Sequence, residues 1–176
     1  MKKMMRTLSE EFLETALSCE DAALARLSET VFSADRIFLC GAGRTRLMLQ
    51  AFAMRLMQLG KTVYMVEDVL TPAITKDDLL LVGSGSGETQ SVCRTVQKAK
   101  TYGTTTACVT ANAGSTLAAL CDVTVCLENR SKNALGATAF EAALLLLCDS
   151  IISHAIQTGI TQNAEASLWK YHANLE

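Results

Sequence analysis

The chain has 176 residues, of which 49% are hydrophobic and only 5% aromatic, and its formal net charge is −2. This length is enough for one domain with a substantial core, and that core must be built from aliphatic side chains. Because no extended basic stretch accompanies the near-neutral charge, the composition argues against a nucleic-acid-binding protein.

Seven cysteines raise the question of disulfides or a metal site. No two of them have CxxC spacing, and neither His154 nor His172 lies near a cysteine pair. We therefore interpret the cysteines as small buried residues in a reducing compartment and expect no metal. The first 20 residues carry charges throughout and the richest apolar run, 142–148, is short. We expect a cytoplasmic protein without a signal peptide or membrane contact.

Apolar residues recur at helical spacing from residue 4 to residue 31, which predicts helix that 18–21 can interrupt. Nothing in this stretch suggests chemistry, so we interpret 1–31 as an N-terminal arm or packing helix.

From residue 36 onward, short apolar runs alternate with helical patterns. The predicted strands are 36–40, 63–66, 79–82, 105–110 and 123–127, and the predicted helices are 45–59, 88–102, 115–120 and 138–157. This alternation predicts an α/β fold with a parallel sheet and right-handed crossovers. We expect a single domain over 1–176, with its α/β core at 36–158 and a C-terminal tail at 159–176.

A loop rich in glycine and hydroxyl groups lies between a predicted strand and a predicted helix. It consists of Gly83, Ser84, Gly85, Ser86, Gly87, Glu88 and Thr89. A helix N-terminus offers unpaired N–H groups and a partial positive charge, and glycines let the backbone approach an anion closely. The loop therefore predicts a phosphate site; the alternative is that Ser86 or Gly87 only caps the helix.

Two nucleotide-binding motifs are absent from these loops. Glu88-Thr89 stands where a Walker A loop needs a lysine followed by serine or threonine. The run Gly41-Ala42-Gly43 lacks the third glycine of a dinucleotide fingerprint. Nucleoside triphosphates and NAD are therefore disfavoured.

The stretch Gly41-Ala42-Gly43-Arg44-Thr45 repeats the strand-loop-helix context one unit earlier. In a parallel sheet both loops open at the carboxyl ends of their strands, in the crevice where ligands bind. Arg44 can contact a phosphate or sugar hydroxyls, or it can be an ordinary surface arginine, and both interpretations stay open.

Glu141 lies near the start of an otherwise apolar helix. A carboxylate in such a setting can have a raised pKa and serve as a general base. Residues 138–141 also match a capping box, in which the glutamate only satisfies a backbone N–H, and the local sequence favours that role.

The two histidines lie in the last quarter of the chain. We interpret His154, on the apolar C-terminal helix, as a core or interface residue. His172 is near the terminus, where disorder is common. Trp169 and Tyr171 beside it indicate instead that the tail docks on something, such as a neighbouring subunit.

Taken together, the two loops resemble those of the sugar isomerase (SIS) domain family. The chain is similar, more narrowly, to the 6-phospho-3-hexuloisomerases. This resemblance rests on 51–57, 71–72, 140–141 and the final 172–176. It covers nearly the whole chain; the glycine-serine loop marks SIS domains broadly, whereas the methionine-arginine run and the tail are more specific.

The resemblance implies a flavodoxin-like, three-layer sandwich with a five-stranded parallel sheet, usually in a homotetramer. It implies interconversion of D-arabino-hex-3-ulose 6-phosphate and fructose 6-phosphate through an enediolate, without a metal or organic cofactor. Glu141 takes the position of the family's glutamate and His172 belongs to the matching tail, so both are candidate catalytic residues. The candidate residues for binding the phosphorylated sugar are Gly41, Gly43, Arg44, Thr45, Ser84, Gly85, Ser86 and Thr89.

Several positions depart from the family's pattern. Gln58 stands where the family usually has a histidine, a candidate for ring opening or proton shuttling. Thr45-Arg46 replace serine and glycine, Glu67-Asp68 replace glycine and glutamate, and 134–138 differs from the usual Pro-Met-Gly-Ser/Thr. These changes keep two alternatives open: a module that senses a sugar phosphate without catalysis, and an SIS isomerase with another phosphosugar substrate.

Overall fold

The computed structural model describes residues 1–129, 137–161 and 164–175. Within these residues, five parallel strands form one sheet in the order β2-β1-β3-β4-β5. The strands are β1 (Arg36–Gly41), β2 (Thr62–Met65), β3 (Leu79–Ser84), β4 (Thr105–Thr110) and β5 (Val123–Cys126). The predicted five-stranded parallel sheet is confirmed.

The helices begin and end close to the predicted positions. They are α1 (Lys2–Ala16), α2 (Asp21–Ser33), α3 (Gly43–Gln58), α4 (Gln90–Lys100), α5 (Thr116–Leu120), α6 (Thr138–Gln157) and α7 (Ala164–Lys170). The interruption expected at 18–21 separates α1 from α2. By contrast, α7 lies in the tail, where no helix was predicted.

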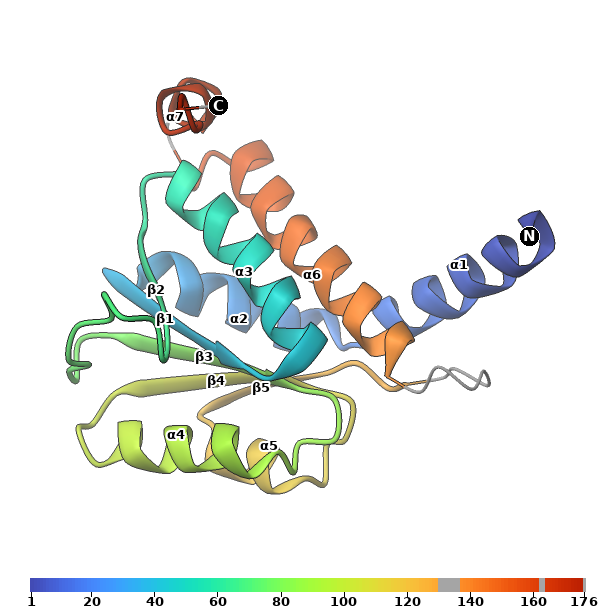
Figure 1. The fold of residues 1–176 in the computed structure, drawn as a ribbon, viewed down its shortest axis with the longest axis horizontal. Helices are drawn as coiled ribbons and strands as arrows, with labels where there is room; N and C mark the ends of the chain where they lie inside the picture. Colours follow the sequence, from blue (N-terminus) through green and yellow to red (C-terminus); the bar gives the residue numbers. More distant parts are fainter. Residues whose placement is uncertain (130–136, 162–163, 176) are drawn as a thin grey trace.

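Helices cover both faces of the sheet and form a three-layer sandwich, as expected. Figure 1 shows α4 and α5 on one face and α2, α3 and α6 on the other. Successive side chains of a strand point to opposite faces. Along β3, Leu79 and Leu81 therefore join the core beneath α3 and α6. Leu80 and Val82 join the core beneath α4 and α5.

Helix α6 is long and apolar enough to cross a membrane by length and composition alone, yet its most apolar window is 56% buried inside the fold. Its buried side chains, such as Phe140 and Ile151, belong to the larger hydrophobic core. We therefore interpret α6 as a core helix.

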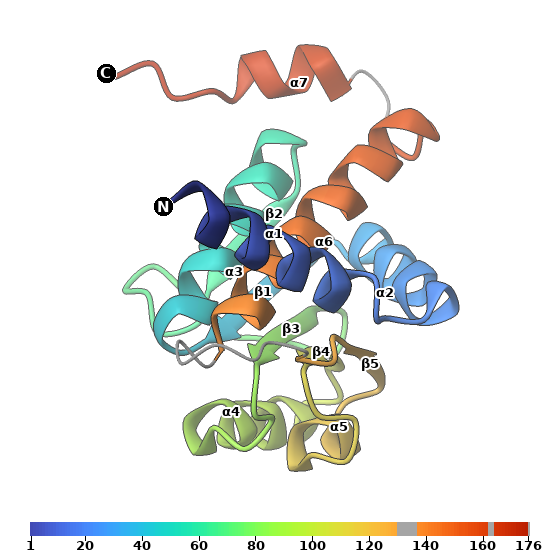
Figure 2. The same cartoon turned by 90° about the vertical axis from the view of Figure 1, so that its right-hand side faces the viewer.

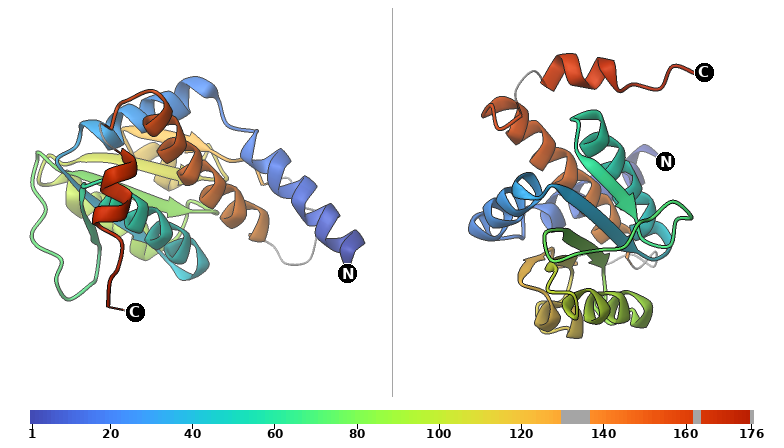
Figure 3. Two further views of the ribbon diagram at one scale, coloured as in Figure 1. Left: turned by 90° about the horizontal axis from the view of Figure 1, so that it is seen from above. Right: turned by 90° about the vertical axis from the view of Figure 1, so that its left-hand side faces the viewer.

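Both ends of the chain lie outside the sandwich. Figures 1 and 3 show α1 extending away from the body of the molecule, with the N-terminus at its far end. Several of its apolar side chains are exposed, including Met4, Met5 and Leu13. Figure 2 shows α7 and the C-terminus beyond the other layers, and α7 contacts α3.

The topology creates a crevice at the carboxyl edge of the sheet. From β1 the chain leads to β2 on one side and then returns to β3 on the other side of β1. The connections that follow β1 and β3 therefore diverge, which is the position where open α/β sheets bind ligands. The register places Gly41 beside Gly83 at this point.

Candidate functional site

The loop after β3 is held together by its own hydroxyl groups. The hydroxyls of Ser84 and Thr89 lie 2.8 Å apart, and Ser84 Oγ accepts from the Gly87 amide at 3.2 Å. Ser86 Oγ accepts from the Glu88 amide at 3.1 Å. Helix α4 begins at Gln90, later than predicted, and its N-cap residue is Thr89 rather than Ser86 or Gly87. The loop thus forms a closed turn in front of a helix N-terminus.

Position 87 admits only glycine in this arrangement. Its φ is +69°, in the left-handed region that other residues seldom adopt. A Cβ atom here would lie 2.1 Å from Ser115 Oγ and 2.9 Å from Thr110 Oγ1. The backbone of the loop is therefore in direct contact with the segment that follows β4.

That segment is a third loop of the site, and it was not among the predicted site residues. The Ala111 amide donates to the carbonyl of Gly85 at 3.0 Å. The backbone and side chain of Thr116 both donate to the Glu88 carboxylate at 2.8 Å, which lowers the pKa of Glu88. This loop could have been predicted from the turn-forming residues at 112–115, which follow the predicted strand 105–110.

The first turn of α3 packs closely on the ends of β1 and β3. A Cβ atom at Gly83 would lie 2.8 Å from the methyl group of Thr45. Thr45 is accordingly buried, with this methyl against the strand, whereas Ala42, Gly43 and Arg44 are exposed. The loop after β1 thus presents its exposed residues next to the loop after β3.

Arg44 and Glu141 form an ion pair, in which Arg44 Nε donates to Glu141 Oε2. The Arg44 side chain is 63% exposed and that of Glu141 only 10%. A capping box would need Thr138 as the N-cap residue of α6, but the N-cap is Ala137. The Glu141 carboxylate therefore reaches across to the loop after β1, and the capping role favoured by the local sequence is wrong.

The start of α6 also contacts the glycine-serine loop. A Cβ atom at Gly85 would lie 3.2 Å from the ring of Phe140, the neighbour of Glu141. The structure thus brings together the loop after β1, the loop after β3 and the start of α6. A closed glycine-serine turn and an arginine–carboxylate pair share one edge of the sheet.

One predicted site residue, His172, lies away from these loops. Tyr171 lies 3.8 Å from the Cβ position of Gly60, beyond the last turn of α3, and His172 follows it. Helix α3 has 16 residues, so its ends are roughly 24 Å apart at about 1.5 Å per residue. His172 therefore lies near the opposite end of α3 from Arg44, and the structure does not bring it to the three loops of its own chain.

The departures from the family pattern do not all lie at the same place in the structure. Gln58 is buried in the last turn of α3, where its side-chain oxygen accepts from Arg55 at 3.1 Å. It is therefore distant from Arg44 and Glu141. Of 134–138, only the last two residues are among the described ones. Arg46, in contrast, belongs to the first turn of α3.

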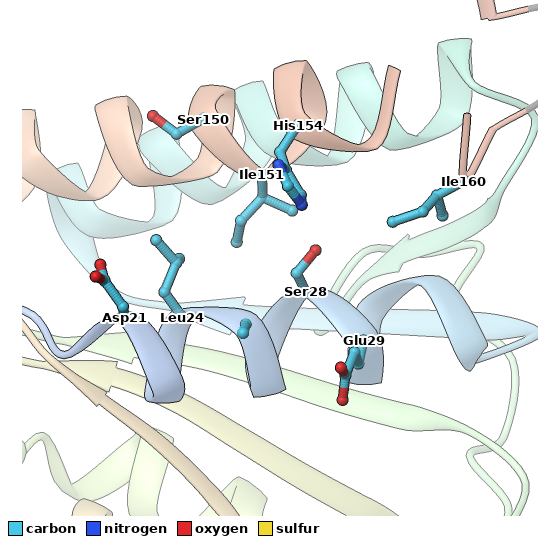
Figure 4. Close-up of a pocket in the computed structure, with 9 residues that line it drawn as sticks. Asp21, Leu24, Ser28, Glu29, Ser150, Ile151, His154 and Ile160 are labelled. Carbon is cyan, nitrogen blue, oxygen red and sulfur yellow. The ribbon is translucent and has the colours of Figure 1, made fainter. Parts of the chain in front are cut away.

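Figure 4 shows a separate cavity of about 370 Å³ between α2 and α6. His154 lines it and is exposed, so the prediction of a core residue is wrong, and an interface role stays a prediction. None of the predicted site residues lines this cavity, so it is not part of the site. Across the described ranges, no group of three His, Cys, Asp or Glu side chains is arranged to hold a metal ion.

The chain is similar to known proteins both in sequence and in fold. The model of the SIS domain family matches residues 30–152. The 3-hexulose-6-phosphate isomerase of Mycobacterium gastri is 35% identical over 95% of this chain and 87% of its own length. That of Bacillus subtilis is 34% identical over 86% of this chain and 85% of its own length.

A solved structure resembles the fold over almost its full extent. It is that of a Methanococcus jannaschii protein for which a molecular function of 3-hexulose-6-phosphate isomerase has been inferred. The TM-score is 0.87 and the identity 30%, and the match covers 99% of both chains.

Proposed function

Because the chain belongs to the SIS domain family and, within it, to the family of the 3-hexulose-6-phosphate isomerases, we propose that it interconverts D-arabino-hex-3-ulose 6-phosphate and fructose 6-phosphate. The observation that carries this proposal is the Arg44–Glu141 pair, which lies beside a glycine-serine turn at the carboxyl edge of the sheet. An anion-binding turn and a carboxylate are the two groups that proton transfer on a phosphosugar requires.

The phosphate binds in the loop after β3, at the N-terminus of α4. Gly85, Ser86 and Thr89 supply backbone and hydroxyl donors there, and the closed turn around Ser84 keeps them in place. The positive end of α4 adds a favourable field for a dianion. Gly41, Gly43 and Thr45 border the sugar from the loop after β1.

Glu141 acts as the base. Its carboxylate takes the proton from C2 of the hex-3-ulose, and the electrons of that C–H bond form a 2,3-enediolate whose negative charge rests on the C3 oxygen. The same carboxylate returns the proton to C3 while a carbonyl forms at C2, as O2 gives up its proton and O3 gains one. The Arg44 guanidinium, adjacent to Glu141, stabilises the charge on oxygen without a cofactor.

His172 serves the site of a neighbouring copy in a homotetramer. The distance along α3 argues against its use in its own chain. Exposed apolar side chains on α1, and Trp169 at 75% exposure beside His172, are suited to contact another subunit. A reducing, cytoplasmic location agrees with seven cysteines that all lie within the described ranges as free thiols.

Solvent exchange tests the reaction. The protein is incubated with fructose 6-phosphate in deuterated water, and proton NMR follows deuterium at C3. We expect exchange at C3, because Glu141 takes that proton in the reverse reaction, and its carboxyl group exchanges the proton with solvent before it returns one to the enediolate. No deuterium at high protein concentration, with fructose 6-phosphate still bound by calorimetry, would contradict the proposal and indicate the sensing module. Turnover of an aldose phosphate alone would indicate another substrate.

Subunit complementation tests the role of His172. Two variants, Glu141→Gln and His172→Gln, are each expected to be inactive as homotetramers of about four chain masses by light scattering. If each site combines residues of two copies, mixing and reassembling the two variants restores part of the activity. A mixture as inactive as its components would contradict a shared site.

A further inference from the structure

Arg46 joins the start of α3 to the turn that follows β2. Its Nη1 donates to the Val66 carbonyl at 2.8 Å, and its Nη2 donates to Asp68 Oδ1 at 2.7 Å. The Glu67 carboxylate lies 3.9 Å from the same guanidinium. We call this group of contacts, from Arg46 to residues 66–68, the Arg46 clamp.

The clamp holds a strained turn. Glu67 has a φ of +75° and is the one non-glycine residue with positive φ among those described. The turn is closed by a bond from Thr71 Oγ1 to the Met65 carbonyl at 2.6 Å and one from the Asp68 amide to the same carbonyl at 3.1 Å. Such a backbone conformation persists only where its surroundings fix it, and it is most frequent at functional sites.

The first turn of α3 needs external support because its own bonds are weak. Its N-cap residue, Ala42, has no side chain that can cap the helix. The first helical hydrogen bond, from the Arg46 amide to the Ala42 carbonyl, is long at 3.4 Å. Side chains therefore fix this turn on two sides: Arg44 reaches to α6 and Arg46 to the end of β2.

The clamp joins two of the departures described for the sequence. The resemblance to the hexuloisomerases implies glycine at the position of Arg46 and Gly-Glu at the positions of Glu67-Asp68. These changes, about 20 positions apart in the sequence, meet in one set of contacts. The long cationic side chain of Arg46 and the acidic, glycine-free turn at 66–68 therefore form one structural unit.

We propose that Arg46 is a positioning residue of the isomerase site. The clamp fixes the first turn of α3, and through that turn it holds Arg44 beside Glu141. This inference rests on the proposed function and extends it to a residue that touches neither the substrate nor the base. A merely structural clamp would change stability alone, whereas a positioning clamp changes the chemical step, because small displacements of catalytic groups are costly.

Three variants and a matched control test this inference. Arg46→Ala removes the clamp, Asp68→Asn weakens one contact, and Arg46→Lys keeps a cation that can reach one acceptor. The control, Lys100→Ala, removes an ion pair with Asp122 at 2.8 Å that is distant from the site. For each, kcat, KM and the melting temperature are measured with fructose 6-phosphate.

We expect Arg46→Ala to lower kcat by about tenfold or more while KM changes by less than about threefold. Arg46→Lys recovers part of kcat, Asp68→Asn has an intermediate effect, and Lys100→Ala leaves kcat unchanged. Equal kcat values for Arg46→Ala and wild type would overturn the inference, even if the melting temperature falls. So would a loss confined to KM.

Amide hydrogen exchange separates this inference from the proposed function. Wild-type protein without isomerase activity would contradict the proposed function alone. The clamp is then tested by the rate of amide hydrogen exchange at residues 44–47. Arg46→Ala should raise that rate, and Lys100→Ala should not. Unchanged exchange in Arg46→Ala would overturn the clamp even in an active isomerase.

Discussion

The two loops at the carboxyl edge of β1 and β3 are built in opposite ways. The loop after β3 contains hydrogen bonds of its own, made by the hydroxyl groups of Ser84, Ser86 and Thr89. The loop after β1 has no such bonds in its described contacts and is held from outside, by Arg44 and Arg46. The first arrangement suits a fixed receptor for a constant group, the phosphate. The arrangement of the loop after β1 suits charged side chains that must be oriented toward the reacting carbons.

Removing the proposed base, Glu141, should have the largest effect, and it should leave the loop after β3 unchanged. We expect Glu141→Gln to lower kcat by about 10²- to 10⁴-fold, because an amide cannot accept the proton. The affinity for fructose 6-phosphate should stay within about threefold of wild type, since the loop after β3 retains its bonds. Steady-state kinetics and calorimetry measure these quantities. Glu29→Gln on α2 is the control, and unchanged turnover in Glu141→Gln would remove Glu141 from the mechanism.

Adding a methyl group to each loop compares their packing. Gly87→Ala should lower the free energy of unfolding by about 2–4 kcal/mol and weaken phosphate binding, because it combines a left-handed φ with a collision against Ser115. Gly43→Ala, at a φ of +55° with no atom within 4 Å, should cost only about 1 kcal/mol. Urea denaturation measures both. Similar losses at the two positions would show that the loops do not differ in packing.

The sequence predicted the features that depend on local order. Strand 105–110 agrees residue for residue with β4, and the glycine-serine loop lies between a strand and a helix as expected. Apolar runs and glycines report directly on such elements, because burial and backbone freedom act over a few residues. The edge of the sheet that carries the site followed from the parallel order alone.

Contacts between residues that are far apart in the chain could not be predicted from the sequence. Arg44 and Glu141 are 97 positions apart, and the local pattern at 138–141 pointed to a cap instead. The packing of α6 against Gly85, rather than the local sequence, determines that the Glu141 side chain pairs with Arg44. The position of His172 depends on where α7 rests against α3, which no short-range pattern encodes.

Relieving the strained turn beside the loop after β1 should have a smaller effect. Glu67→Gly should raise the free energy of unfolding by up to about 1 kcal/mol, because glycine adopts a φ of +75° without steric cost. Glu67→Ala is the control, since it removes the carboxylate but keeps the strain. Thermal denaturation compares the two variants. A lower melting temperature for Glu67→Gly than for Glu67→Ala would indicate that the turn is not strained.

The smallest effect concerns pH and the loop after β3. The two hydrogen bonds from Thr116 lower the pKa of Glu88 below its ordinary value of 4.5. A carboxylate with a lowered folded-state pKa contributes stability that is complete above the unfolded pKa and is lost as pH falls through the folded one. The difference in unfolding free energy between wild type and Glu88→Gln should therefore be constant from pH 6 to 8 and shrink below about pH 4.

Thr116→Val, which removes the side-chain donor, serves as the control and should lessen the acid dependence of that difference. If the difference in unfolding free energy stays constant down to pH 3, the hydrogen bonds from Thr116 of α5 to Glu88 do not lower the pKa of Glu88. Because Glu88 keeps its charge from pH 6 to 8, the geometry of the phosphate loop should not titrate through this residue there. Any change in kcat over that range must then arise from groups other than Glu88.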